Sequence, residues 1–255
     1  MGVRIIADDY GMSLEINNAI SDLISRNIIS KTSVMASDIC TYVPTDIEKA
    51  ETGLHIDFAV PMKGAIISTP PQISLIRLLF FIFINKFKAG HMIDVIKYQH
   101  DLLKSKGIKV LYLDTHKHVH IVPRILNALI FYAKNNGIKS IRCLTMERKY
   151  YLYYLRSLIR HGFLAQIPKM ILLYSLGVLM KMKLDKSEIH YSNNLFLMPL
   201  ALRGNYSGLL MDLLTKLKDE DAEIVTHPGL ETECIGADTY IKGRYIEYSS
   251  LLKLI

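Results

Sequence analysis

The chain has 255 residues, with 31 basic against 24 acidic residues, a formal net charge of +7 and a hydrophobic content of 50%. This length suits one large α/β domain, and three widely separated cysteines exclude a disulfide framework or a zinc knuckle. Only three apolar residues separate Arg4 from Asp8, so we expect no signal peptide and a cytoplasmic location. The basic excess favours an anionic partner without choosing among nucleic acid, phosphorylated sugar and membrane.

The chain opens with a β-branched run that ends in two adjacent acids. Residues 3–6 predict a buried strand, and Asp8 and Asp9 follow it before a glycine turn. Ser13 can then cap a helix whose apolar residues recur at helical spacing. Because unpaired charge is costly to bury, these acids either face solvent and cap the helix or serve a site. In a site, one acid could hold a metal while the other works as a base.

Strand and helix patterns then alternate along the chain. Further strands are predicted at residues 32–36, 53–58, 110–114, 140–142 and 223–229. Helices are predicted at residues 44–51, 93–106, 123–135, 206–217 and 239–254. Such alternation predicts a parallel α/β architecture. We expect a single domain over residues 1–255, an irregular TIM-barrel-like (β/α) barrel with two insertions at about 60–90 and 147–190.

Four groups of polar side chains share one position, the end of a predicted strand. They are the pair Asp8 and Asp9, His55, the histidine cluster that begins at His116, and His227. In a β/α barrel the carboxyl ends of all strands meet at one face, where active sites are built. We therefore expect these four groups to form a single site.

The densest signal is the pattern His116-x-His118-x-His120. Imidazole nitrogen is a favoured ligand of zinc and other transition metals, and a carboxylate oxygen completes a mixed site. Two histidines and one carboxylate form a facial set that leaves positions open for water and substrate. Asp114 precedes His116 by two residues and could orient its other ring nitrogen.

Two further residues end predicted strands. His227 is followed by proline and glycine, and a histidine held in this way is placed for proton transfer. Arg142 closes the strand at 140–142, where it binds an anionic group, orients a carboxylate or serves as a structural ion-pair partner.

Taken together, the motifs resemble those of the YdjC-like carbohydrate deacetylases, a family that includes chitooligosaccharide deacetylases. The matching segments are Ala7-Asp-Asp-Tyr-Gly11, Gly53-Leu-His55, Asp114-Thr-His-Lys-His-Val-His120 and His227-Pro-Gly229. They occur in the family's order and span nearly the whole chain. Two positions depart from the usual motif: Tyr10 stands where the family has phenylalanine, and Lys117 stands where it often has histidine.

The resemblance implies a barrel-like fold related to polysaccharide deacetylases and hydrolysis of an N-acetyl group on an amino sugar. Carried over residue by residue, it makes Asp9, His55 and His116 the ligands of one divalent metal ion. It makes Asp8 the base and His227 the acid of the reaction.

The metal and the supporting residues are less closely specified. The donor set suits zinc, manganese, iron or magnesium, and we expect magnesium or zinc. The remaining polar residues, Asp114, His118, His120 and Arg142, are expected to support the ligands or bind substrate. The sequence leaves the acyl group, the sugar and the oligomeric state, including a homodimer, open.

Two other classes compete with the deacetylase. A metal-dependent sugar isomerase or epimerase uses similar ligands in a similar barrel, and release of acetate would separate it. A basic module that binds nucleic acid is not favoured, because the glycine and aromatic signatures of common RNA-binding folds are absent from the sequence.

The second insertion, residues 147–190, is rich in basic, aromatic and aliphatic residues. Its uncharged run at 170–180 has 11 residues, which predicts a helix too short to cross a bilayer. Basic residues around an apolar helix are typical of an interfacial helix. We therefore consider two interpretations, a lid on the barrel and a dock on the inner membrane surface for a lipid-linked amino sugar.

Overall fold

The structure is a computed structural model that describes residues 2–36, 45–59, 75–84, 86–231 and 240–254. Within these residues seven strands form one parallel sheet. They are β1 (Val3–Tyr10), β2 (Lys31–Val34), β3 (Glu51–Ile56), β4 (Tyr112–Thr115), β5 (Ser140–Ile141), β6 (Leu195–Leu197) and β7 (Ala222–Thr226). Their spatial order, β5-β4-β3-β2-β1-β7-β6, is the cyclic order of a β/α barrel that is opened between β5 and β6.

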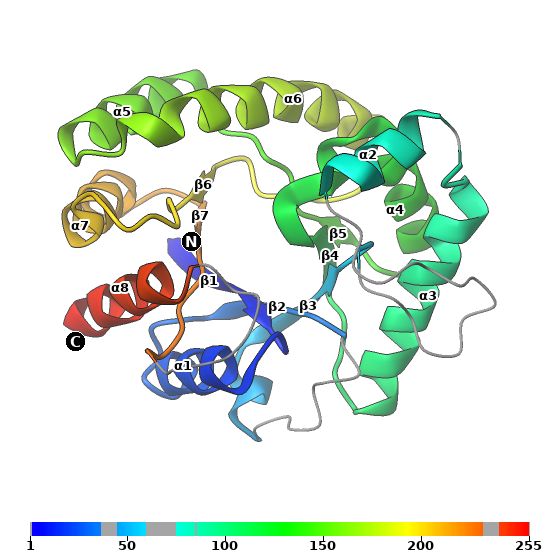
Figure 1. Cartoon of the computed structure of the whole chain (residues 1–255), viewed down its shortest axis with the longest axis horizontal. Helices are drawn as coiled ribbons and strands as arrows, with labels where there is room; N and C mark the ends of the chain where they lie inside the picture. The colour runs from blue at the N-terminus through cyan, green and yellow to red at the C-terminus, as the bar shows by residue number, and fades with distance from the viewer. Residues whose placement is uncertain (1, 37–44, 60–74, 85, 232–239, 255) are drawn as a thin grey trace.

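The two ends of the sheet approach each other across this opening. His190, ahead of β6, forms a parallel bridge with Ser140, and the N–H of Leu195 donates to the carbonyl oxygen of Thr145 at 2.9 Å. Among the described residues no continuous ladder joins β5 to β6. The predicted parallel α/β architecture is therefore confirmed as a curled, barrel-like sheet (Figure 1).

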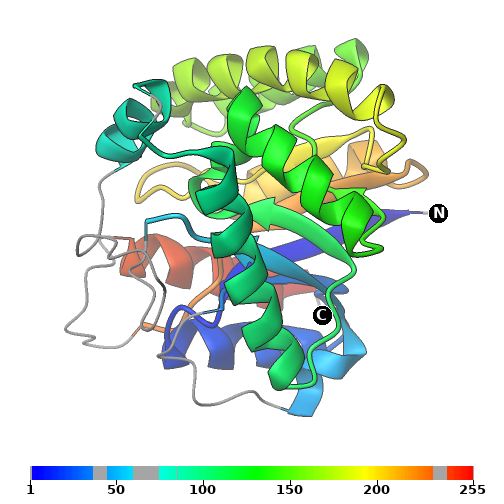
Figure 2. The same ribbon diagram turned by 90° about the vertical axis from the view of Figure 1, so that its right-hand side faces the viewer.

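Eight α-helices, counted over the described ranges, surround the sheet (Figures 1 and 2). They are α1 (Leu14–Ser25), α2 (Leu75–Phe83), α3 (Ala89–Ser105), α4 (Pro123–Asn135), α5 (Arg148–Arg160), α6 (Ile167–Asp185), α7 (Tyr206–Leu217) and α8 (Ile241–Leu251). The helix predicted at 44–51 is a 3-10 turn over Thr45–Lys49, and residue 44 lies outside the described residues. The short strand β6 was not predicted.

The two predicted insertions are helical where the structure describes them. Residues 60–74 of the first lie outside the described residues, and α2 follows them. The second is a helical hairpin, in which α5 and α6 are joined by a 3-10 turn. The rings of Tyr151 and Tyr154 on α5 pack edge-on against Tyr174 on α6.

The helical stretch Leu164–Asp185 has 22 residues and, within the described part of the chain, is long and apolar enough to cross a membrane. The expectation that this helix is too short was therefore wrong, because helical residues extend the uncharged run at both ends. One face of the stretch belongs to the domain: a Cβ on Gly177 would lie 1.7 Å from the carbonyl oxygen of Leu144. Only 28% of the apolar window is buried, so the other face is open.

Candidate active site

Both acids of β1 reach the site because the strand carries a β-bulge at its end. The register against β2 shifts between Ala7 and Tyr10, so Asp8 and Asp9 lie opposite a single residue, Ser33. Asp9 adopts a left-handed φ of 69°, which aspartate tolerates better than most side chains. A bulge re-aims side chains, and here both carboxylates are buried.

Asp9, His55 and His116 come together where β1, β3 and β4 end. Their ligand atoms lie within 4.8 Å of one another. Oδ1 of Asp9 is 3.0 Å from Nδ1 of His116 and 3.3 Å from Nε2 of His55. Two ligands about 2.1 Å from one ion are separated by roughly 3.0–3.4 Å in octahedral or tetrahedral geometry. The three side chains therefore fit a divalent ion.

Asp114 supports this set through His55. Its Oδ1 lies 2.7 Å from Nδ1 of His55, and the β3–β4 register pairs the two residues. The expected contact of Asp114 with His116 was wrong, because His116 begins the 3-10 turn that follows β4. Burial lowers the pKa of His55, but the charges of Asp114 and Asp8 outweigh it and raise the pKa well above its usual value. A carboxylate on the far ring nitrogen is typical of metal-binding histidines.

Asp8 is held by Arg142. The two guanidinium nitrogens Nη1 and Nη2 lie 2.6 and 2.7 Å from the two carboxylate oxygens, and Nη1 also lies 2.8 Å from Oδ2 of Asp114. Burial would raise the pKa of Asp8, but the charge of Arg142 outweighs it and the pKa is lowered. Asp8 is therefore ionised at neutral pH, and Arg142 orients a carboxylate.

Of the histidine cluster, only His116 faces the ligand set. Lys117 and His118 have left-handed φ values of 56° and 54°, which turn the chain away from the strand direction. Nδ1 of the buried His120 lies 2.6 Å from Oγ of Thr115, whereas Nδ1 of His118 has no hydrogen-bond partner among the described residues. Burial holds the pKa of His118 well below its usual value and lowers that of His120 to about 4. Both rings are therefore neutral at neutral pH.

His227 follows β7 directly and lies beside β1, since Thr226 pairs with Ala7. Its backbone N–H donates to Oε2 of Glu247 at 2.6 Å, and its Nδ1 is 3.8 Å from Oε1 of the same carboxylate. The hydroxyl of Tyr206 donates to Oε2 of Glu247 at 3.0 Å. This buried carboxylate on α8 fixes the segment that carries His227.

Two residues at the site, Arg244 and Glu247, were not predicted from the sequence. Both lie on the buried face of α8, and Nη2 of Arg244 donates to Oδ2 of Asp9 at 2.7 Å. Burial raises the pKa of Asp9, but hydrogen bonds from His116 and His55 and the charge of Arg244 hold it well below its usual value. The sequence offered one indication of these residues: Arg244 and Glu247 are opposite charges three residues apart on a helix that has no strong apolar face.

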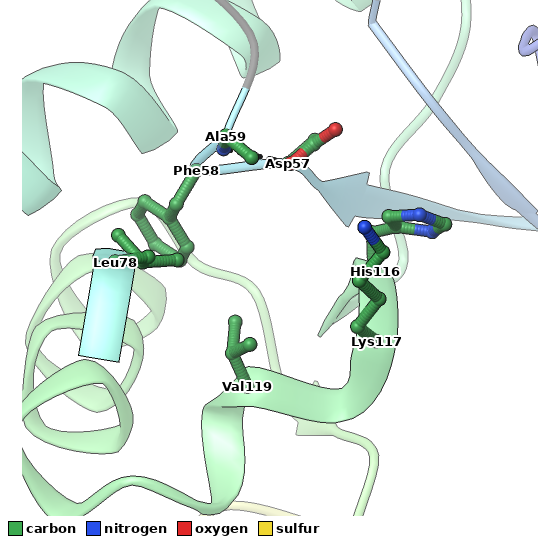
Figure 3. A pocket seen from close by; sticks show the side chains of 7 residues that line it. All are labelled: Asp57, Phe58, Ala59, Leu78, His116, Lys117 and Val119. Atoms are coloured by element: carbon green, nitrogen blue, oxygen red, sulfur yellow. Dashed lines mark hydrogen bonds between the residues drawn. The ribbon is translucent and has the colours of Figure 1, made fainter. Parts of the chain in front are cut away.

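A pocket opens beside His116 (Figure 3). Its walls are Asp57, Phe58, Ala59, Leu78, His116, Lys117 and Val119. Leu78 belongs to α2, so the first insertion contributes one wall of a pocket that also contains a candidate metal ligand. The pocket therefore lies between α2, the end of β3 and the turn that carries His116.

These features define a barrel-like α/β protein with a candidate divalent-metal site at the carboxyl ends of its strands. The sequence profile of the YdjC-like protein family matches residues 3–253. The chain therefore belongs to the YdjC-like family, and the resemblance noted in its motifs is confirmed.

The chain is also similar to a curated protein and to a solved structure. A carbohydrate deacetylase of Vibrio parahaemolyticus serotype O3:K6 (strain RIMD 2210633) is 27% identical to it over 147 residues. This match covers 54% of the chain and 57% of the relative, so it spans little more than half of the relative's length. A crystal structure of a candidate cellobiose-phosphate cleavage protein from Enterococcus faecalis V583 has a TM-score of 0.69 and 14% identity, over 98% of this chain and 89% of that one. The latter likeness shows the fold alone.

Proposed function

We propose that this chain is a metal-dependent hydrolase that removes an N-acetyl group from an amino sugar, and that it acts in the cytoplasm. The proposal is carried by the convergence of Asp9, His55 and His116, with the ionised Asp8 beside them. Membership of the YdjC-like family and the name of the Vibrio relative support the same chemistry.

Asp9, His55 and His116 would hold the divalent ion, with magnesium or zinc as the expected metal. When bound, the ion supplies a Lewis acid that polarises the acetyl carbonyl and lowers the pKa of a water molecule. Arg244 engages Oδ2 of Asp9 and Asp114 engages Nδ1 of His55, so Oδ1 and Nε2 are the atoms left to face the ion.

The protein's own groups move the protons. Asp8 accepts the proton of the attacking water, because it is ionised and each oxygen held by Arg142 retains a second lone pair. His227 gives a proton to the departing amine, which is otherwise a poor leaving group, and Glu247 positions it. His118 lies near Asp8 and His227. Its buried Nδ1, which has no hydrogen-bond partner among the described residues, is a candidate contact for the sugar.

Acetate assays test this proposal. Metal-loaded protein is incubated with a panel of N-acetylated mono-, di- and lipid-linked sugars, with a chelator-treated sample as the control. We expect acetate release that chelation abolishes and added metal restores, with an unchanged circular dichroism spectrum. Conversion of a sugar without acetate release would refute the hydrolase and favour the isomerase or epimerase alternative.

A further inference from the structure

One layer of helices presents apolar side chains to solvent. On α6 the exposed residues are Ile171, Leu172, Val178, Leu179 and Met182, each at least 43% exposed. The opposite face of the helix packs inward through Met170, Leu173, Tyr174, Gly177, Met180 and Leu184. A helix that is apolar on all sides is normally covered on all sides. The outer face of α6 is therefore a candidate contact surface for a membrane or another protein.

Two neighbouring helices also carry exposed apolar side chains. On α5, Leu152 and Ile159 are 48% and 53% exposed, and on α2, Ile76, Phe80 and Phe83 are 81%, 55% and 84% exposed. The three helices lie at the same end of the molecule, at the top of both views (Figures 1 and 2). We call the exposed apolar residues of α2, α5 and α6 the apolar surface. Ten exposed apolar residues on three helices at one end of the molecule are the kind of feature that marks an interaction site.

Basic residues accompany the apolar surface. Residues 147–190 carry eight lysine or arginine residues and three acidic residues, and residues 75–90 carry three basic residues and no acid. Lys149, Arg160 and Lys181 pair with acids. Within the described residues no ion pair joins Lys183 or Lys186 to an acid. Apolar burial combined with unneutralised positive charge is what anionic lipid headgroups bind.

We propose that the apolar surface docks this protein on the anionic surface of a membrane. The helix α6 lies flat rather than crossing the bilayer, because its inner face is fixed to the segment after β5 by the close approach of Gly177 to Leu144. A second copy could cover the same face, but a two-fold interface would bring the excess positive charge of both copies together. Anionic headgroups neutralise that charge instead.

The docking surface reaches the candidate active site through α2. Leu78, on the buried side of α2, lines the pocket that contains His116 (Figure 3). Docking through α2 sets this pocket near the boundary between lipid and water, where a lipid-linked amino sugar presents its head group. This second step rests on the proposed function, whereas docking itself does not.

Sedimentation of the full chain with vesicles tests the docking. The vesicles are phosphatidylcholine alone or mixed with phosphatidylglycerol, at low and at high salt. We expect binding to the anionic vesicles that weakens with salt, because the electrostatic part is screened. Leu172→Ser with Leu179→Ser should abolish binding, whereas Phe131→Ser with Met211→Ser, at residues 56% and 52% exposed on other helices, should not. Circular dichroism checks that each variant is folded.

A charge reversal tests the electrostatic part. Lys183→Glu with Lys186→Glu should weaken vesicle binding by at least about 25-fold, since each basic residue near the surface contributes roughly fivefold. Lys242→Glu with Lys253→Glu changes the net charge equally at the C-terminal end of the chain and should have little effect.

Two results would overturn the docking. One is wild-type protein that stays in the supernatant with anionic vesicles at low salt. The other is a dimer, seen by light scattering, that the double serine variant converts to a monomer. Vesicle binding without acetate release from any sugar would refute the proposed function and leave the docking supported.

Discussion

Replacing Arg142 with methionine removes the charge that holds two buried carboxylates. The guanidinium contacts Asp8 at 2.6 and 2.7 Å, Asp114 at 2.8 Å and Ser33 at 2.9 Å, and its side chain is 1% exposed. Removing one partner of a buried ion pair costs about 3–5 kcal/mol, because the remaining charge is left uncompensated. Methionine keeps most of the volume, so we expect a loss of this size in the free energy of unfolding, measured with urea in the presence of chelator.

Arg4→Met is the matched control for this variant. Arg4 also pairs with two acids, Asp221 and Glu223, but at 3.4 Å and with 37% of its side chain exposed. Exposed ion pairs contribute about 0–1 kcal/mol. The difference between the two variants therefore measures the effect of burial on one residue type.

The loss caused by Arg142→Met should grow with pH. In the wild type, burial raises the pKa of Asp8 and Asp114 but Arg142 outweighs it, so both are lowered and their stabilisation is complete above the ordinary value of 3.8. Without Arg142, burial and the charge of Asp114 raise the pKa of Asp8 against the weaker charge of His55, so the folded variant binds a proton more tightly than the unfolded chain and loses stability as pH rises above about 4. A loss no larger than that of Arg4→Met, or an equal loss at about pH 5 and about pH 8, would refute this reasoning.

Asp8→Asn should keep its metal affinity in calorimetry yet lose acetate release by ~10²–10⁴-fold, whereas Asp9→Asn should lose both; equal metal loss in the two variants would contradict the division. Glu247→Gln should lower acetate release by roughly tenfold or more without changing metal affinity, because it weakens the contact that holds the backbone of His227 in place. Unchanged acetate release would show that Glu247 does not position His227. Lys117→Gly should raise the free energy of unfolding by about 0.5 kcal/mol in urea titrations, since its φ of 56° suits glycine; a decrease would show that the lysine side chain itself stabilises the turn.

Local signals predicted the elements whose ends are set by nearby residues. The helix α4 begins at Pro123 and stops before Gly137, which has a left-handed φ of 68°, and the side chain of Asn205 caps α7. These capping interactions do not depend on the rest of the fold. The strand β6 was missed because three residues are too few to show a period of two.

The sequence predicted those site residues that lie at strand ends, because the topology of the sheet brings strand ends together. The ligands of the site all lie at strand ends, and a barrel-like sheet collects strand ends at one face. Arg244 could not be found in this way, because it lies within a helix and 235 positions from Asp9 in the sequence. The partner of Asp114 was wrong for a related reason: strand register places His55 opposite it, and a single sequence does not determine register.

The bulge in β1 explains how two identical neighbours can differ in role. On a regular strand Asp8 and Asp9 would point to opposite faces, and only one would enter the site. The bulge turns both carboxylates into the site, where each one contacts a different arginine. Arg142 engages both oxygens of Asp8, whereas Arg244 engages one oxygen of Asp9 and leaves the other beside two imidazoles. A carboxylate with one oxygen free can bind an ion directly. A carboxylate bound at both oxygens is held rigidly, and only its remaining lone pairs can accept a proton. This difference favours Asp9 as the ligand and Asp8 as the base.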